Sequence, residues 1–183
     1  MIAAVPSSGA WRTISVEVQA LHTDASRFQR REAVDEERLL ALEEAGRQHC
    51  GASFCPHRYE PLELWQDPEG RLWVLAGHHR HQLALRAQVR FVDARVMSGA
   101  EVDAVAYAAR SNARTKPYAP LEEAGIFRDL SNRGWSWERI GAELDGRRPE
   151  YYRKRAGLSY LCDALKACVR DGTLRAEYGE VIG

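Results

Sequence analysis

Apolar and polar residues alternate along several short segments in the first half of the chain. Ile14, Val16 and Val18 are separated by polar residues, which is the period of a half-buried strand. The sequence DPEG at 67–70 is typical of a hairpin turn between two such segments. The predicted strands cover residues 13–19, 62–65, 72–76 and 89–96.

Apolar residues at helical spacing predict helices between and after these strands. In the first helix we expect Leu39, Leu40 and Leu42 to face inward, and acidic residues occupy its first turn. Ser136 is a suitable N-cap, and Pro149 is a suitable first helical residue. The predicted helices begin near residues 35, 79, 98, 121, 136, 149, 161 and 174.

The pattern changes near residue 115. Strands and helices alternate before this point, whereas only helices are predicted after a stiff linker at 116–120 that contains two prolines. We therefore predict the α+β class: a leader at 1–12, an α/β domain at 13–115 and an all-helical domain at 116–183.

The bulk composition limits the classes of function. The formal net charge is zero, so any contact with nucleic acid must come from a local patch. We find no secretion signal and no membrane-length apolar run, and we expect a cytoplasmic protein. The cluster of His49, Cys50, Cys55 and His57 contains zinc-binding residue types, but it lacks paired spacing and favours ordinary packing.

The most informative segment is LAGHHRHQLALRA, residues 75–87. An apolar strand runs through Gly77 into a helix, and such a turn directs backbone N–H groups and the positive end of the helix dipole toward one point. Arg80 lies in the first helical turn, where a cation is unfavourable unless an anion binds. This pattern predicts a phosphate site. The alternative is a surface cluster of Arg and His on an ordinary strand-to-helix turn, which would have the same sequence pattern.

A second candidate surface lies in the helical half. A short helix, a turn and a basic helix at 135–157 resemble a helix-turn-helix. The segment between Asn132 and Leu158 contains seven Lys or Arg residues and four acidic residues, which is a modest local excess of positive charge. The alternative is a helical bundle with solvated arginines. The candidate DNA contacts are Arg147, Arg148, Arg153 and Lys154.

Three segments, in order, resemble the motifs of the ParB family and of the sulfiredoxin-like fold that it shares. SRFQRR at 26–31 resembles NPxQPRR, Gly77 to Arg80 resembles the start of GERRxRA, and SNARTKPYAPLEEA at 111–124 resembles ENLQRxxLNPxEEA. The helix-turn-helix then follows where the family has one. The order and spacing of these weak motifs cover nearly the whole chain.

This resemblance implies a CTP-gated homodimer. It implies a Mg-CTP pocket made of Gln29, Arg30, Arg31, Gly77, His78, His79, Arg80, Ser111 and Asn112. The family's second-motif and third-motif acids are His78 and Ser111 here, so we expect no catalytic residues and at most weak CTPase activity. Asn112 remains as a weak Mg²⁺ ligand.

The resemblance also suggests further partners and leaves alternatives. The candidate partners are DNA and either a ParA-type ATPase or a scaffold protein, although the leader lacks the short basic motif with which ParB proteins stimulate that ATPase. No C-terminal dimerisation domain is recognisable before Gly183, so we expect either that the sequence is truncated or that the protein dimerises only through its first domain. The second reading is a helix-turn-helix regulator whose first domain is only a dimerisation scaffold.

Two enzymatic readings rank lower. A sulfiredoxin-type reductase would need a cysteine where His78 stands. A nuclease or small-molecule kinase would need a base such as His78 and a metal carboxylate, for which Asp24, Glu32 and Asp35 are the nearest candidates.

Overall fold

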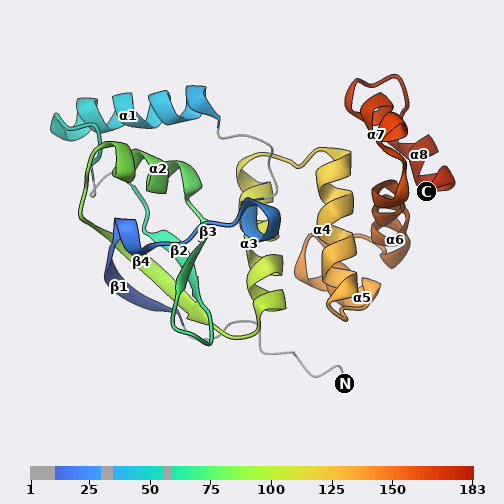
Figure 1. Ribbon diagram of the computed structural model, residues 1–183, viewed down its shortest axis with the longest axis horizontal. Coiled ribbons are helices and arrows are strands. Elements are labelled where there is room, and N and C mark those ends of the chain that lie inside the picture. The colour runs from blue at the N-terminus through green and yellow to red at the C-terminus, as the bar shows by residue number, and fades with distance from the viewer. Residues whose placement is uncertain (1–10, 30–34, 56–58) are drawn as a thin grey trace. The chain divides into compact units, whose positions relative to one another are not determined.

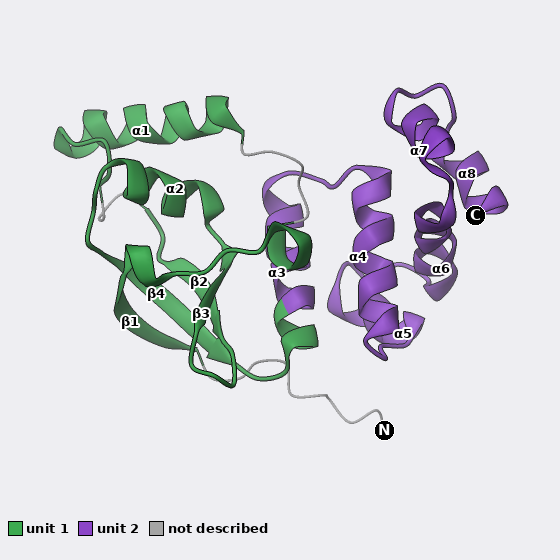
Figure 2. Ribbon diagram, viewed as in Figure 1, with its two compact units in different colours: residues 1–104 green, residues 105–183 purple. Residues whose placement is uncertain are grey.

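The computed structural model describes residues 11–29, 35–55 and 59–183. The chain divides into two compact units, residues 1–104 and residues 105–183, which are drawn in separate colours in Figure 2. Each unit has its own buried core.

A four-stranded sheet with the order β1-β4-β2-β3 forms the centre of the first unit (Figure 1). The pairs β1–β4 and β2–β3 are antiparallel, whereas β2 and β4 are parallel. The antiparallel β2–β3 hairpin confirms the turn predicted at 67–70. The strands are β1 (Arg12–Glu17), β2 (Leu62–Gln66), β3 (Leu72–Ala76) and β4 (Phe91–Ser98).

The helices α1 (Glu36–Cys50) and α2 (His78–Arg86) contribute to the core on one face of the sheet. Leu39 and Leu83 from these helices pack with alternate strand residues such as Leu64. Burying an aliphatic side chain of this size contributes about 1.5–3 kcal/mol. The prediction that Leu40 faces inward is wrong, because it is 55% exposed. Successive helical residues are about 100° apart, and the buried face that includes Leu39 does not extend to Leu40.

The opposite face of the sheet is partly covered by η2 (Ala25–Gln29), a single π-helical turn. Phe28 of η2 is buried, and its ring centroid lies 6.0 Å from that of Trp65 and 6.3 Å from that of Trp73. The Asp24 carboxylate accepts two backbone N–H bonds from η2, at 2.9 and 3.1 Å. The predicted polar connection therefore contains an ordered turn that its own aspartate stabilises.

The turn of the β2–β3 hairpin is closed by a buried carboxylate. Asp67 accepts hydrogen bonds from the Arg71 backbone at 2.8 Å, the Arg71 guanidinium at 2.6 Å and the Trp73 indole at 2.9 Å. Burial raises the pKa of Asp67, but these hydrogen bonds outweigh it and lower the pKa to about 2.

The second unit is entirely helical, which confirms the predicted α/β half followed by a helical half. Ser136 caps α5 (Trp137–Glu143) by accepting a backbone N–H bond at 3.2 Å, and Pro149 is the first residue of α6 (Pro149–Gly157), as predicted. None of the helices in the described part of the chain is long and apolar enough to cross a membrane. The remaining helices are η1 (Val18–Ala20), α3 (Glu101–Thr115), α4 (Pro120–Asn132), α5 (Trp137–Glu143), α6 (Pro149–Gly157), η3 (Leu158–Tyr160), α7 (Asp163–Arg170) and α8 (Ala176–Ile182).

Candidate functional site

The turn between β3 and α2 has the geometry that the sequence predicts. Gly77 adopts φ 96° and ψ 23°, a left-handed conformation that favours glycine, and α2 begins at the next residue. A Cβ atom at Gly77 would lie 2.8 Å from Leu62 Cδ2 and 2.9 Å from an Arg80 guanidinium nitrogen. The first turn of α2 carries no carboxylate. Backbone dipoles at this helix start therefore favour an anion.

Arg80 bends back over this turn. Its Nη1 donates to the backbone carbonyls of Glu60 and Pro61, the latter at 3.1 Å. Burial lowers the pKa of the Arg80 guanidinium, while the nearby carboxylates of Glu60 and Glu63 raise it. An arginine remains protonated under these influences. Arg80 therefore fixes the segment before β2 and keeps a positive charge beside Gly77.

His79 connects the starts of two helices. Its Nε2 accepts the backbone N–H of Asp35 at 3.3 Å, and Asp35 in turn caps α1. A second connection is the bidentate pair of Arg86 and Glu36, at 2.8 and 3.0 Å. His79 therefore holds the N-terminal end of α1 at the start of α2, and Arg86 ties it to the last turn of α2.

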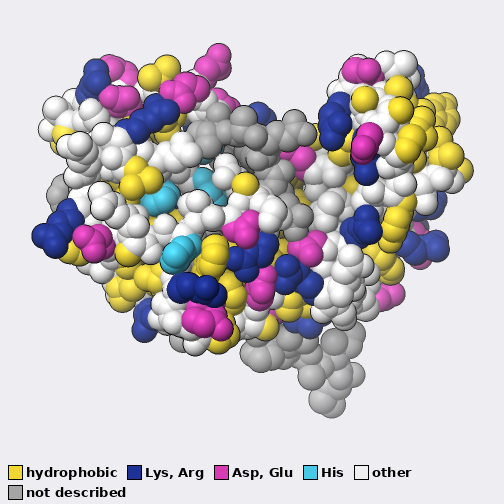
Figure 3. Space-filling view, in the orientation of Figure 1, with side chains coloured by type: hydrophobic (Ala, Val, Ile, Leu, Met, Phe, Trp, Pro, Cys, Tyr) yellow, Lys and Arg dark blue, Asp and Glu magenta, His cyan; other side chains and the backbone are white. Residues whose placement is uncertain are grey.

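The other two histidines of the motif are buried. His78 is 6% exposed and His81 is 5% exposed. His81 Nε2 lies 3.2 Å from the Val18 carbonyl, and burial lowers the pKa of its imidazole although this hydrogen bond opposes the shift. Figure 3 shows, in cyan, the histidine side chains that reach the visible face of the first unit.

The first motif is placed only in part. Gln29 is half-buried at the end of η2, whereas Arg30 and Arg31 lie outside the described residues and stay predictions. Ser111 and Asn112 are half-buried on α3, in the part of that helix that belongs to the second unit. Their role beside Gly77 also stays a prediction.

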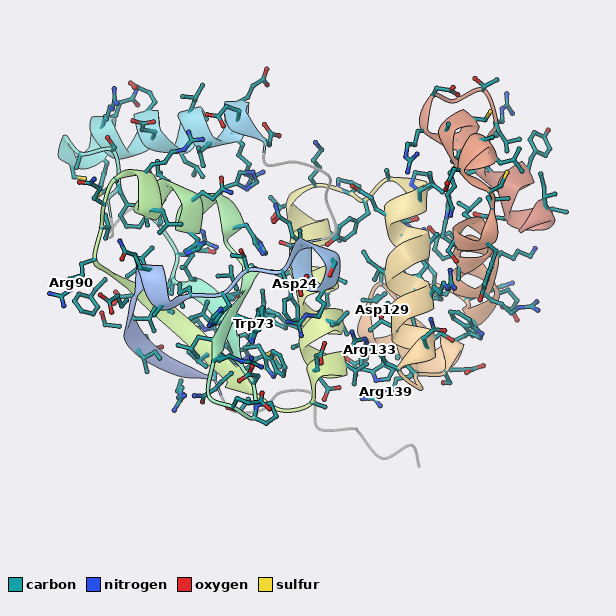
Figure 4. All side chains as sticks on the ribbon, in the orientation of Figure 1. Asp24, Trp73, Arg90, Asp129, Arg133 and Arg139 are labelled. Carbon is teal, nitrogen blue, oxygen red and sulfur yellow. The ribbon has the colours of Figure 1, made fainter. Side chains whose placement is uncertain are left out.

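Arg27 is a residue that sequence reasoning missed. Its guanidinium pairs with Asp24 at 2.6 Å and with Glu101 at 3.1 Å, and it lies 4.3 Å from the centroid of the Trp73 ring. Asp24 and Trp73 are labelled in Figure 4. These contacts anchor η2 to β3 and to the start of α3. The separation of three residues between Asp24 and Arg27 could have indicated their ion pair, but nothing in the sequence indicates the contact with Glu101.

The candidate DNA contacts surround the turn between α5 and α6. Arg148, Arg153 and Lys154 are exposed. Arg147 pairs with Asp145 at 2.9 Å and stacks 4.4 Å from the Tyr151 ring centroid, so its charge is offset locally.

Close packing fixes this helix pair. Tyr152 is fully buried, donates its hydroxyl to Asp145 and accepts the Arg147 backbone N–H at 3.0 Å. Burial and Asp145 raise the pKa of Tyr152 to about 12. A Cβ atom at Gly141 would lie 2.8 Å from the Arg147 carbonyl, so the approach of the two segments requires a small residue.

No metal-binding group of three or more His, Cys, Asp or Glu side chains is found among the described residues. His57, the fourth residue of the zinc pattern considered above, lies outside them. The side-chain amide of Asn112 is a neutral oxygen ligand, which Mg²⁺ accepts beside phosphate oxygens and water.

Comparison with known proteins identifies the fold. No protein-family model and no curated protein sequence matches the chain. The structure of the C-terminally truncated chromosome-partitioning protein ParB from Caulobacter crescentus, complexed to the centromeric parS site, matches with a TM-score of 0.60 and 19% identity, covering 92% of this chain and 83% of that chain. The pNOB8-like ParB N-domain matches with a TM-score of 0.59 and 12% identity, covering 93% and 74%. A Caulobacter ParB structure complexed with CTP-gamma-S matches with a TM-score of 0.44 and 21% identity, covering 95% and 92%. The chain therefore has a ParB-like fold, with an α/β unit followed by a helical unit.

Proposed function

We propose that this protein is a ParB-like CTP-binding protein whose first unit dimerises when CTP binds. It would act in chromosome or plasmid partition, or as an adaptor to partition machinery, with a ParA-type ATPase or a scaffold protein as its candidate partner. The observation that carries the proposal is the turn at Gly77, where a left-handed glycine, a helix start without carboxylates and the Arg80 guanidinium meet.

The geometry suits a phosphate group. Backbone N–H groups at a helix start donate hydrogen bonds to phosphate oxygens, and the helix dipole favours their charge. Arg80 contributes a positive charge while its Nη1 holds the carbonyls of Glu60 and Pro61. The pocket is thus preorganised in part, which reduces the entropic cost of binding. Gln29, Arg30, Arg31 and Asn112 complete the proposed set by resemblance to the family motifs.

We propose that CTP hydrolysis is weak or absent. His78 and Ser111 stand where the resemblance places acids, and the His78 side chain is buried. Phosphoryl transfer depends on a group that orients the attacking water and on a well-held metal ion. Asn112 alone would hold Mg²⁺ weakly, because this ion usually takes one or two carboxylates.

Calorimetric titration with CTP, ATP, GTP and UTP, with and without Mg²⁺, tests the proposal. We expect micromolar binding of CTP alone, lost in Arg80→Ala. The matched control is Arg47→Ala, which removes the same charge from an exposed position in the last turn of α1 and should keep the affinity. Absence of binding to every nucleotide would overturn the proposal, as would equal losses in the two variants.

The second candidate function is a DNA-binding regulator whose first unit is a scaffold. The supporting observation is the α5–turn–α6 segment, which presents Arg148, Arg153 and Lys154 to solvent. The Caulobacter ParB of similar fold is complexed to its parS site. A salt-dependent gel shift on specific DNA that does not respond to CTP would favour this function.

A further inference from the structure

A groove of about 350 Å³ lies within the second unit, between α4, α5, α6, η3 and α8. Arg153 and Lys154 of its lining are also candidate DNA contacts, but Arg128 and Tyr160 lie outside the helix-turn-helix segment. The side chains that matter for its chemistry are Arg128, Asn132, Trp137, Arg153, Lys154 and Tyr160.

Three cations of this groove have no acidic partner. Within residues 105–183, all of which the structure describes, Arg128, Arg153 and Lys154 form no ion pair. Three other arginines of the unit are neutralised by neighbours: Arg110 by Glu143, Arg133 by Asp129, and Arg147 by Asp145. Glu180 also lines the groove, but it pairs with Arg155 at 3.1 Å. The groove therefore carries a net positive charge in a chain whose formal net charge is zero.

An exposed aromatic ring lies beside these charges. Tyr160 is 63% exposed, and the Arg128 guanidinium stacks 4.5 Å from its ring centroid. This cation–π contact supports one side of the ring. Trp137 adds a second aromatic side chain to the lining. A supported, exposed ring next to unpaired cations is the combination that binds unpaired bases and their phosphates.

We propose that this groove binds single-stranded nucleic acid, with one base stacked on Tyr160 and the adjoining phosphates bound by Arg153 and Lys154. A base can lie on the ring only when it is unstacked from its neighbours, which favours a single strand over a duplex. This site is independent of the CTP site at Gly77. It also differs from the proposed duplex contact, because Arg128 and Tyr160 belong to the groove alone.

Fluorescence anisotropy of the full chain with a labelled oligothymidine, and with a hairpin duplex of equal length, tests this site. We expect Tyr160→Ala to weaken oligothymidine binding about tenfold. Tyr160→Trp should retain binding, because it preserves the aromatic face. Lys154→Ala should reduce the slope of log affinity against log salt concentration by about 0.7. Arg175→Ala, an exposed arginine outside the groove, is the matched charge control.

No oligothymidine binding by the unmodified protein would overturn the proposal. Equal affinities of Tyr160→Ala and the unmodified protein would do the same, since binding would then be electrostatic only. Preferential binding of the hairpin, weakened by Tyr160→Ala, would overturn the assignment to single strands. CTP titration of Tyr160→Ala should be unchanged, so the two proposals fail separately.

Discussion

Replacement of Gly77 by alanine is the sharpest test of the turn at the start of α2. Alanine in a left-handed conformation costs about 1–2 kcal/mol. The new Cβ would also lie 2.8 Å from Leu62 Cδ2, and Leu62 is only 3% exposed, so the side chain has little room to move. Overpacking of this kind adds about 1–3 kcal/mol. We therefore expect Gly77→Ala to lose about 2–5 kcal/mol of unfolding free energy.

Gly70→Ala is the matched control. Gly70 also has a positive φ, 84°, but the nearest atom to a Cβ placed there is the Gln66 amide nitrogen at 3.9 Å. Only the conformational cost of about 1–2 kcal/mol should apply. At about 4 °C per kcal/mol, thermal denaturation followed by circular dichroism should show losses of about 8–20 °C for Gly77→Ala and about 4–8 °C for Gly70→Ala. Equal losses would refute the close packing of Leu62 against the turn.

Three further predictions concern groups that stabilise the interior of one unit or the other. Arg27→Ala should lower the unfolding free energy measured by urea denaturation by about 1–3 kcal/mol, because it leaves the half-buried carboxylates of Asp24 and Glu101 without their cation. The control is Arg90→Ala, whose partner lies 3.6 Å away at an exposed site, and it should lower the unfolding free energy by less than about 0.5 kcal/mol. Equal losses would contradict the anchoring role of Arg27. Tyr152→Phe should lose about 1–3 kcal/mol in the same assay, because the hydroxyl bridges the α5–α6 turn, and an unchanged midpoint would contradict this. Asp67 has a pKa of about 2 in the folded protein against an ordinary 3.8, so its contribution to stability is complete above pH 4 and is lost as the pH falls toward 2. Asp67→Asn should flatten that part of the curve of unfolding free energy against pH. An unchanged curve would contradict the assignment.

Local patterns in the sequence predicted most elements of the fold. The alternation around Val16, the DPEG turn, the Ser136 cap and Pro149 each act through neighbouring residues, and each predicted its element within a few residues. The fourth strand covers 91–98 instead of 89–96, because the backbone N–H of Val89 donates to the Ala84 carbonyl of α2 at 2.9 Å and not to a neighbouring strand. Apolar period alone does not mark such an end.

The candidate site could be predicted only where it is local. Gly77 and the helix after it form a continuous segment, so their geometry was readable. The bonds from Arg80 to the carbonyls of Glu60 and Pro61 join segments about twenty residues apart, and the loop that carries those carbonyls has no periodic pattern. The contact of Arg27 with Glu101 spans a greater separation and depends on the sheet order.

Long-range contacts also changed the interpretation of charge. A count of Lys and Arg in 132–158 treats every cation alike, but Arg147 and Arg155 pair with acids whereas Arg153 and Lys154 do not. Which cations can bind a polyanion therefore follows from tertiary pairing and not from composition.

The central claim is that CTP controls association of this protein with itself. Sedimentation equilibrium of the purified chain, without nucleotide and with CTP or ATP, measures this directly. The account predicts a mass of 20.7 kDa without nucleotide and with ATP, and twice that mass with CTP. The same mass under all three conditions would contradict it.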